Sequence, residues 1–211
     1  MMFRHKAMVF QGVVLALAIV MAAGSYGGEI SVQDHNPELT HVALPKKPNK
    51  VVSLVPEITQ VLCALGVGDA VVGVTWLDTY PPEVTQKPIV GGFLAPTIER
   101  IMALDPDVIF VSPLHQDVRR RLAEGPYRTI ELRSESILDL YRNIEFLGTL
   151  FDRQAQAEEL VLKMRHKFDL VSRKVHKVPV AERKRVMRLM GRDHVMAPGD
   201  DSFQNDVIRA A

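Results

Sequence analysis

The sequence has little that could hold its fold together covalently or mark it as a nucleic-acid binder. It contains one cysteine, Cys63, so no internal disulfide can form and the core alone must stabilise the fold. It lacks a charge excess, because 26 Lys and Arg stand against 25 Asp and Glu. This balance predicts no nucleic-acid partner, which would usually need a basic face. Internal repeats and low-complexity tracts are also missing.

Familiar catalytic motifs are absent as well. The chain has no G-x-S-x-G, no H-E-x-x-H, no Walker loop and no paired-cysteine metal spacing. Residues 66–69 resemble a dinucleotide-binding loop, but they follow a helical pattern, and Val71 stands where the third glycine belongs. Asp105 and Asp107 are interpreted as turn residues, and Cys63 as a small, partly buried residue. We therefore interpret the chain as a non-enzyme without a cofactor.

The N-terminus has the pattern of a secretory signal. Residues 4–6 are basic, residues 7–21 are mostly apolar, and residues 22–24 are small. This predicts a signal peptide at residues 1–24, cleaved before Ser25. An uncleaved membrane anchor is the weaker interpretation, because the apolar run falls short of the ~20 residues that span a bilayer. The expected location is the periplasm.

Strand and helix patterns alternate over residues 50–135, after a polar lead-in at residues 25–49. Short β-branched runs predict strands at residues 51–55, 71–74, 89–90, 108–111 and 129–132. Apolar residues at helical spacing predict helices at residues 57–65, 96–104 and 117–124. This alternation implies an α/β fold with a mostly parallel sheet that is covered on both faces.

The pattern changes after this lobe. Ser136 is a good N-cap, and apolar residues at helical spacing continue from there to Pro179. A break near Phe151 predicts a short helix followed by a long one. Residues 185–190 resemble a new strand, followed by a loop and the first turns of a helix. We interpret residues 182–211 as the start of a second, incomplete lobe.

Three ordered segments carry a family resemblance. Residues 51–59, VVSLVPEIT, resemble the V-S-L-x-P-x-x-T-E opening of class III periplasmic binding proteins of ABC importers. Residues 68–82 resemble the V-x-G-V-T and Y-P-P segment of that family. Residues 91–109 resemble its V-G-x segment followed by N-x-E-x-I-x-x-L-x-P-D-L-V. The similarity runs from about residue 50 to residue 211.

This resemblance implies both a fold and a function. The family fold is two α/β lobes joined by one long helix, with the ligand held between the lobes. Its members deliver corrinoids, haem or ferric siderophores to a permease in the inner membrane. A chelatase-like enzyme or metal-handling protein on a related scaffold is the alternative that the sequence leaves open.

The expected ligand site lies at the carboxyl ends of the first-lobe strands, where α/β sheets bind ligands. Phe93 matches a ring that packs on the ligand in the corrinoid-binding relative, and Ser112 stands where that relative has tryptophan. Trp76, the only tryptophan, could pack on a flat macrocycle. Core packing is the alternative role for both aromatic residues. The candidate ligand-binding residues are Glu57, Trp76, Leu77, Phe93, Ser112, His115 and Met196.

Two further roles involve charge or metal coordination. His115 or His194 could ligate haem iron, although a lone histidine on a loop is more often a solvated polar residue. Glu99 matches the family glutamate that pairs with permease arginines. Its alternative role is to stabilise the first turn of its helix, because a negative charge there interacts favourably with the helix dipole. The two roles are compatible.

Overall fold

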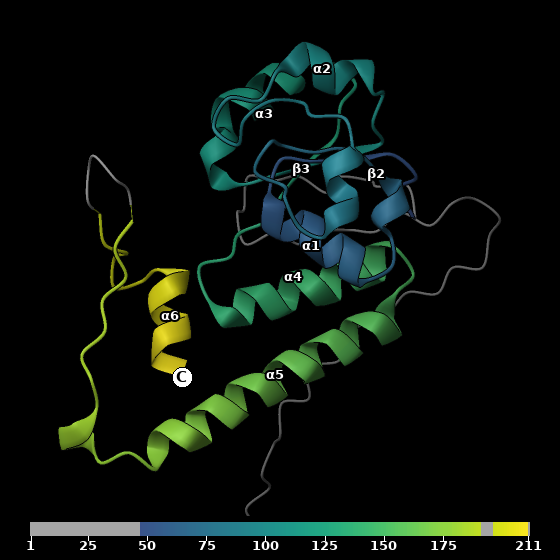
Figure 1. The fold of residues 1–211 in the computed structure, drawn as a ribbon. Coiled ribbons are helices and arrows are strands. Elements are labelled where there is room, and N and C mark those ends of the chain that lie inside the picture. The colour runs from purple at the N-terminus through teal and green to yellow at the C-terminus, as the bar shows by residue number, and fades with distance from the viewer. Residues whose placement is uncertain (1–46, 191–195, 211) are drawn as a thin grey trace, which may run out of the picture.

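A four-stranded parallel sheet lies at the centre of the first lobe in the computed structural model, which describes residues 47–190 and 196–210 (Figure 1). Its strands are β1 Val51–Ser53, β2 Val71–Gly73, β3 Val108–Val111 and β4 Thr129–Glu131. They lie in the order β2-β1-β3-β4, and every neighbouring pair is parallel. The predicted signal segment, most of the lead-in and His194 fall outside the described residues.

One predicted strand of this lobe is wrong. Residues 89–90 form no strand, because only an isolated parallel bridge joins Ile89 to Val74. Pro88 has no amide hydrogen to donate, and Gly91 adopts a positive φ of 127°, so no ladder can extend beyond the bridge. The segment therefore lies beside the chain that continues from β2 without becoming a fifth strand.

Helices cover both faces of the sheet because successive strand residues point to opposite sides. Val51 and Phe110 pack with α1 and α4 on one face, whereas Val52 and Ile109 pack with α2 and α3 on the other. Figure 1 shows these two helical layers above and below the strands. The elements are α1 Pro56–Ala64, α2 Ile98–Ala103, α3 Gln116–Leu122 and the 3-10 turns η1 Gly68–Ala70, η2 Pro82–Gln86 and η3 Pro113–His115.

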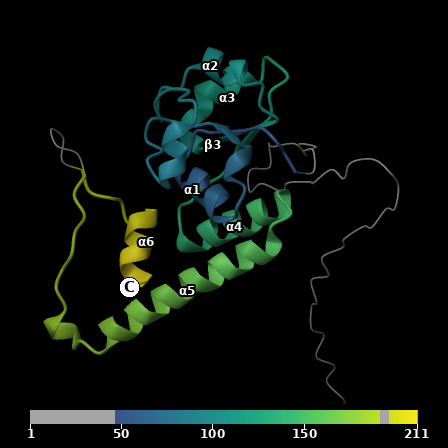
Figure 2. The same cartoon turned by 45° about the vertical axis from the view of Figure 1, so that its right-hand side comes forward.

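The predicted short and long helices are present as α4 (Ile137–Leu150) and α5 (Gln154–His176). Ser136 caps α4, since its Oγ accepts from the Asp139 amide and the Asp139 carboxylate bonds back to Ser136. The two helices pack side by side (Figures 1 and 2). No helix in the described part of the chain is long and apolar enough to cross a membrane.

The segment after α5 differs from the prediction. Residues 185–190 form no strand, and only an isolated antiparallel bridge joins Met190 to Met196. Strands are stable when neighbouring strands or packed helices bury them, whereas Met187 in this segment is exposed. The 3-10 turn η4 (Val180–Glu182) precedes it and α6 (Phe203–Ala210) follows.

Helix α6 returns to the first lobe through α4. The Asp206 carboxylate accepts a hydrogen bond of 2.7 Å from the Ile137 amide at the start of α4. Phe203 packs against the core cluster that contains α1 and α4. In Figure 2 the C-terminal helix accordingly lies beside the start of α4. The described part of the segment therefore adds a helix to the first lobe and contributes no second sheet.

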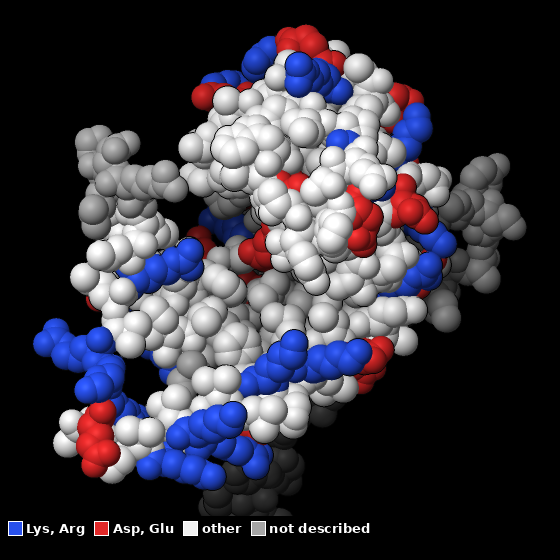
Figure 3. Space-filling view, in the orientation of Figure 1, with Lys and Arg blue, Asp and Glu red and all other residues white. Residues whose placement is uncertain are grey.

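Positive charge is concentrated near the C-terminal half of α5. Between residues 163 and 188 the chain has ten Lys and Arg but only two Asp and Glu. Figure 3 shows Lys and Arg side chains gathered along this part of the surface. The near-neutral net charge of the whole chain therefore conceals a basic segment balanced by an acidic remainder.

Candidate functional site

The carboxyl edge of the sheet brings together loops that are distant in sequence. In a parallel sheet the segments that follow all strands emerge at the same edge. Glu57 lies three residues after Leu54, Trp76 lies on the loop after β2, and Ser112 directly follows β3. Hydrogen bonds and ring contacts connect most of the predicted ligand-binding residues at this edge.

The loop after β2 holds Trp76 and Leu77 outward. Both Thr75 and Asp78 are buried, and Asp78 Oδ2 accepts hydrogen bonds from the Thr75 amide (2.8 Å) and the Thr75 hydroxyl (2.6 Å). The Leu77 amide donates to Thr75 Oγ1 (3.3 Å). The Trp76 side chain remains 60% exposed. A buried polar turn therefore presents an apolar tip to solvent.

A second loop, residues 91–96, packs against that tip. The Trp76 amide donates to the Gly91 carbonyl (3.0 Å). A Cβ on Gly92 would lie 2.5 Å from Trp76 Nε1, so only glycine leaves room for the indole ring in this position. Leu94 is exposed on the same loop. The two loops therefore form one surface that combines aromatic and aliphatic side chains.

His115 joins the second loop to β3. Its side chain is only 2% exposed, which corrects the expectation of a solvated loop histidine. Nδ1 lies 2.9 Å from the Ser112 amide and Nε2 lies 2.6 Å from the Phe93 carbonyl. The rings of His115 and Phe93 meet edge to face with centroids 4.9 Å apart. The predicted residues Phe93, Ser112 and His115 thus form one cluster.

The hydrogen bonds of His115 define its tautomer. The Ser112 amide can only donate, so Nδ1 accepts, and the Phe93 carbonyl can only accept, so Nε2 carries the hydrogen. Both ring nitrogens are therefore engaged, and neither offers a lone pair to haem iron in this structure. Burial lowers the pKa of the imidazole, and the hydrogen bond to the Phe93 carbonyl opposes that effect.

Glu57 occupies the first turn of α1 and faces an internal partner. Its carboxylate accepts a hydrogen bond of 2.6 Å from the Ser134 hydroxyl, which in turn accepts from Asn143 Nδ2 (3.0 Å). Burial raises the pKa of the Glu57 carboxyl, and the Ser134 hydrogen bond opposes this. The residue therefore connects α1 to the loop after β4 and to α4.

Sequence reasoning missed an ionic cluster at the end of β4. The Glu131 carboxylate is almost completely buried and pairs with Arg119 of α3 and, at 2.9 Å, with Arg133. Two guanidinium groups thus hold one buried carboxylate at this edge of the sheet. The alternation of Ile130 and Glu131 along a strand was the available signal, but the partner from α3 depends on the tertiary fold.

The remaining two predicted residues lie elsewhere. Glu99 is in the first turn of α2, with its side chain 74% exposed and 3.4 Å from Arg121 of α3. Met196 is exposed on the C-terminal segment, where its backbone pairs with Met190. No contact described here connects either residue to the cluster around His115.

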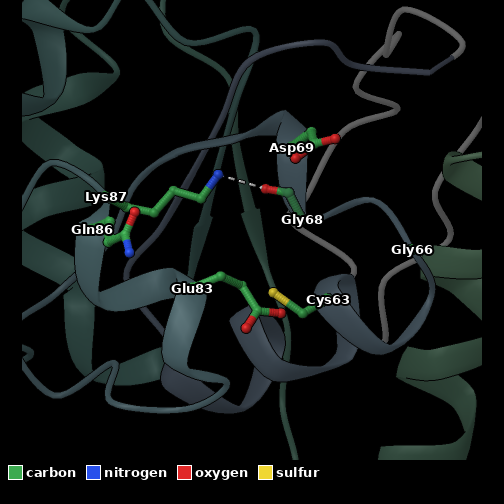
Figure 4. A pocket seen from close by; sticks show the side chains of 7 residues that line it. All are labelled: Cys63, Gly66, Gly68, Asp69, Glu83, Gln86 and Lys87. Carbon is green, nitrogen blue, oxygen red and sulfur yellow. Dashed lines mark hydrogen bonds between the residues drawn. The ribbon is translucent and has the colours of Figure 1, made fainter.

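A separate hollow of about 480 Å³ lies at the amino end of β2 (Figure 4). Its lining residues are Cys63, Gly66, Gly68, Asp69, Glu83, Gln86 and Lys87. Lys87 Nζ donates to the Gly68 carbonyl (2.9 Å), and burial raises the pKa of the Cys63 thiol. Across residues 47–190 and 196–210, no three His, Cys, Asp or Glu side chains are grouped to hold a metal ion.

Residues 51–211 match the family model described as "Periplasmic binding protein". The chain belongs to this family. A Bacillus subtilis relative, named an uncharacterized ABC transporter substrate-binding lipoprotein, is 30% identical over 173 residues, which cover 79% of this chain and 55% of the relative. The cobalamin-binding protein of Halobacterium salinarum is 28% identical over 82% of this chain and 47% of its own length. The chain therefore spans about half the length of these curated relatives.

Solved structures of the family agree on the fold. A possible iron-binding, periplasmic solute-binding protein from Staphylococcus epidermidis matches with a TM-score of 0.64 and 26% identity, over 78% of this chain and 66% of the other. The petrobactin-binding protein YclQ from B. subtilis matches with a TM-score of 0.73 over 86% of this chain and 64% of the other; at 22% identity it informs on the fold alone. The predicted α/β fold, with a parallel-sheet lobe leading into a long helix, is confirmed.

Proposed function

We propose that this chain is the ligand-binding component of an ABC importer, located outside the cytoplasmic membrane. It captures a metal–organic ligand, such as a corrinoid, haem or a ferric siderophore, and presents it to a permease in the inner membrane. Family membership and the names of the relatives support this proposal. These names describe binding and transport, which favours a binding protein over the chelatase-like alternative.

The observation that carries the proposal is the apolar surface at the carboxyl edge of the sheet. Trp76, Leu77, Leu94 and Leu114 are all large apolar side chains that remain exposed. Exposed apolar groups on fixed loops are typical of ligand sites, because the ligand buries them without the cost of ordering the protein. A planar or bulky chelate can pack on the indole and leucine side chains, while few polar groups orient it.

The ionic cluster restricts the chemical class of the ligand. Arg119 and Arg133 share one buried carboxylate, Glu131, at the end of β4. Guanidinium groups bind carboxylates and other planar oxyanions well. Because the Arg133 side chain is also 48% exposed, it can contact anionic groups at the periphery of a ligand in addition to its present partners.

Docking to the permease is assigned to Glu99. Its carboxylate is highly exposed, and its partner Arg121 is also exposed, so solvent weakens their interaction. An arginine of the permease could therefore replace Arg121 at little cost. Such an exposed charge mainly sets the rate and specificity of encounter.

Titration of the 211-residue chain with haemin, cyanocobalamin and ferric petrobactin tests the proposal. Trp76 is the only tryptophan, so its fluorescence should be quenched by the ligand that binds at this edge. Isothermal titration calorimetry of the same three probes gives the affinities independently. If none of the probes binds, or if binding leaves Trp76 fluorescence unchanged in a calorimetrically confirmed complex, the proposed site is wrong.

A further inference from the structure

We propose that His115 is a positioning residue that fixes Phe93 and the adjoining Trp76 loop at the ligand-binding edge, and that protonation of its imidazole releases them. The first half concerns the ligand-free protein. The consequence for ligand affinity rests on the function proposed above. Neither part requires His115 to contact the ligand.

The geometry supports a tether between two loops. His115 belongs to η3 directly after β3, whereas Phe93 lies 22 residues earlier on the loop that follows Gly92. The 2.6 Å hydrogen bond and the edge-to-face ring contact both join the same two residues. His115 is buried, whereas Phe93 is partly exposed. One side of the tether is therefore anchored in the lobe and the other reaches the surface.

The tether continues to Trp76. The Gly92 amide donates to the Ala95 carbonyl (3.1 Å), which shapes the loop that carries Phe93. The Trp76 amide donates to the Gly91 carbonyl, and the indole ring packs against Gly92. A shift of Phe93 would consequently change the surroundings of the indole. The fluorescence of Trp76 can therefore report on the state of His115.

Protonation is incompatible with this arrangement. A proton on Nδ1 would point an N–H at the Ser112 amide, which is itself a donor, and would remove the acceptor that this amide now has. The Ser112 hydroxyl lies 3.1 Å from the same nitrogen and could accept the new N–H, but the buried Ser112 amide would still face a donor and lose its own acceptor. The charged imidazolium therefore fits best in a rearranged loop.

Charged side chains on the elements that adjoin His115 have other partners. Residues 91–96 contain no titratable side chain. Asp117 pairs with Arg120, Arg119 pairs with Glu131, and Asp78 accepts from Thr75. The lowered pKa of His115 has burial as its first cause, with the Phe93 carbonyl acting in the opposite direction. Among these groups, no carboxylate is a hydrogen-bond or ion-pair partner of His115.

The direction of the pH effect follows from that shift. Because the pKa of His115 is lower in the folded chain than in the unfolded chain, the tether is fully stabilising above the unfolded pKa of about 6.5. Its contribution is lost as the pH falls from there through the folded pKa. Trp76 fluorescence and ligand affinity should both change over that range.

Two substitutions separate the tether from the titration. In His115→Gln, the side-chain amide nitrogen can reach the Phe93 carbonyl as Nε2 does, but glutamine does not titrate. His115→Ala removes the hydrogen bond and the ring contact together. His166→Gln, on the exposed surface of α5, is the matched control for losing one histidine.

The first experiment uses the ligand-free 211-residue chain between pH 8 and pH 4.5. We expect Trp76 emission to titrate with a midpoint below 6.5 in the wild type and in His166→Gln, and to stay flat in His115→Gln. Nitrogen-15 NMR of the wild type should show His115 protonated at Nε2 at pH 8. A titration that persists in folded His115→Gln would overturn the proposal. An Nδ1-protonated tautomer in the wild type would overturn it as well, even if the variants fold poorly.

The second experiment measures affinities for haemin, cyanocobalamin and ferric petrobactin at pH 7.5. Loss of one buried hydrogen bond and ring contact should weaken a probe that binds about 5- to 10-fold in His115→Ala, with most of the affinity retained in His115→Gln. Equal affinities in wild type and His115→Ala would contradict the positioning role. If none of the three probes binds, the proposed function fails while the ligand-free titration still decides the role of His115.

Discussion

The indole nitrogen of Trp76 lies against the space that a side chain at position 92 would occupy. A Cβ built on Gly92 would come within 2.5 Å of Trp76 Nε1. The backbone of one loop thus forms the support for the exposed ring of the other. The orientation of the only tryptophan depends on the absence of a side chain in its neighbour.

Substitution of Gly92 by alanine should therefore displace the indole. We expect Gly92→Ala to shift Trp76 emission and to weaken binding of a probe, because real Cβ atoms do not tolerate a contact of 2.5 Å. Gly199→Ala is the matched control, since a Cβ there would meet nothing within 4 Å. Fluorescence spectra and calorimetric titrations of both variants test this, and an unaltered spectrum in Gly92→Ala would contradict the packing described.

Removal of the ring itself should reduce affinity without unfolding the protein. Trp76 is mostly exposed, so Trp76→Ala should change the free energy of unfolding by less than about 1 kcal/mol. We expect it to weaken binding of a probe at least about 10-fold, as for other aromatic anchors, and Trp76→Phe to retain most of the affinity. Calorimetry provides the affinity, and Leu170→Ala on exposed α5 is the control. Equal losses of affinity in Trp76→Ala and Leu170→Ala would argue against a contact between the ligand and the indole ring.

Charge reversal at Glu99 should affect docking alone. Glu99→Arg would repel permease arginines and also its present partner Arg121. Association with the permease at low salt should weaken, while affinity for the ligand stays the same. Glu124→Arg, an exposed reversal just after α3, is the comparison variant. The role of Glu99 fails if both reversals have the same effect on permease binding.

The capping box of α4 should contribute measurably to stability. Ser136→Ala removes the acceptor for the Asp139 amide and a donor to its carboxylate. We expect the free energy of unfolding to fall by about 0.5–2 kcal/mol. Urea denaturation measures this, with Ser172→Ala within α5 as the control. If the free energy of unfolding of Ser136→Ala does not differ measurably from that of Ser172→Ala, water replaces the hydrogen bonds of the cap.

Export can be tested at the N-terminus. The basic, apolar and small-residue sequence of residues 1–24 predicts cleavage before Ser25. N-terminal sequencing of the exported protein should begin near Ser25. Recovery of an intact Met1 from the membrane fraction would instead support an uncleaved anchor.

Local sequence patterns predicted the regular elements of the first lobe well. The runs at β1, β3 and β4 are rich in β-branched residues and mostly buried, so composition agrees with the fold. The strand predicted at residues 185–190 is absent because a strand needs a neighbouring strand or helix, and a local sequence pattern does not supply one. The strand predicted at residues 89–90 is absent because the single bridge between Ile89 and Val74 does not continue into a ladder of paired residues.

The candidate site was predictable in place but not in detail. Strand ends indicate where loops converge, and this predicts that Trp76, Phe93 and His115 lie at one edge of the sheet. The burial of His115 depends on the Phe93 carbonyl, and the pairing of Glu131 depends on Arg119 from α3. Such partners are distant in the chain, so residue type and spacing cannot reveal them.

The strand order also constrains when the lobe can form. Val51 pairs with Val71 on one side and with Val108 on the other, so β1 lacks the second of its two neighbours until β3 has been made. A chain that emerges stepwise from a ribosome, or passes through a translocation channel, cannot complete the sheet before that point. Pairing of strands that are distant in sequence is slow to form. The chain is therefore expected to stay unfolded until most of the first lobe has been synthesised or translocated.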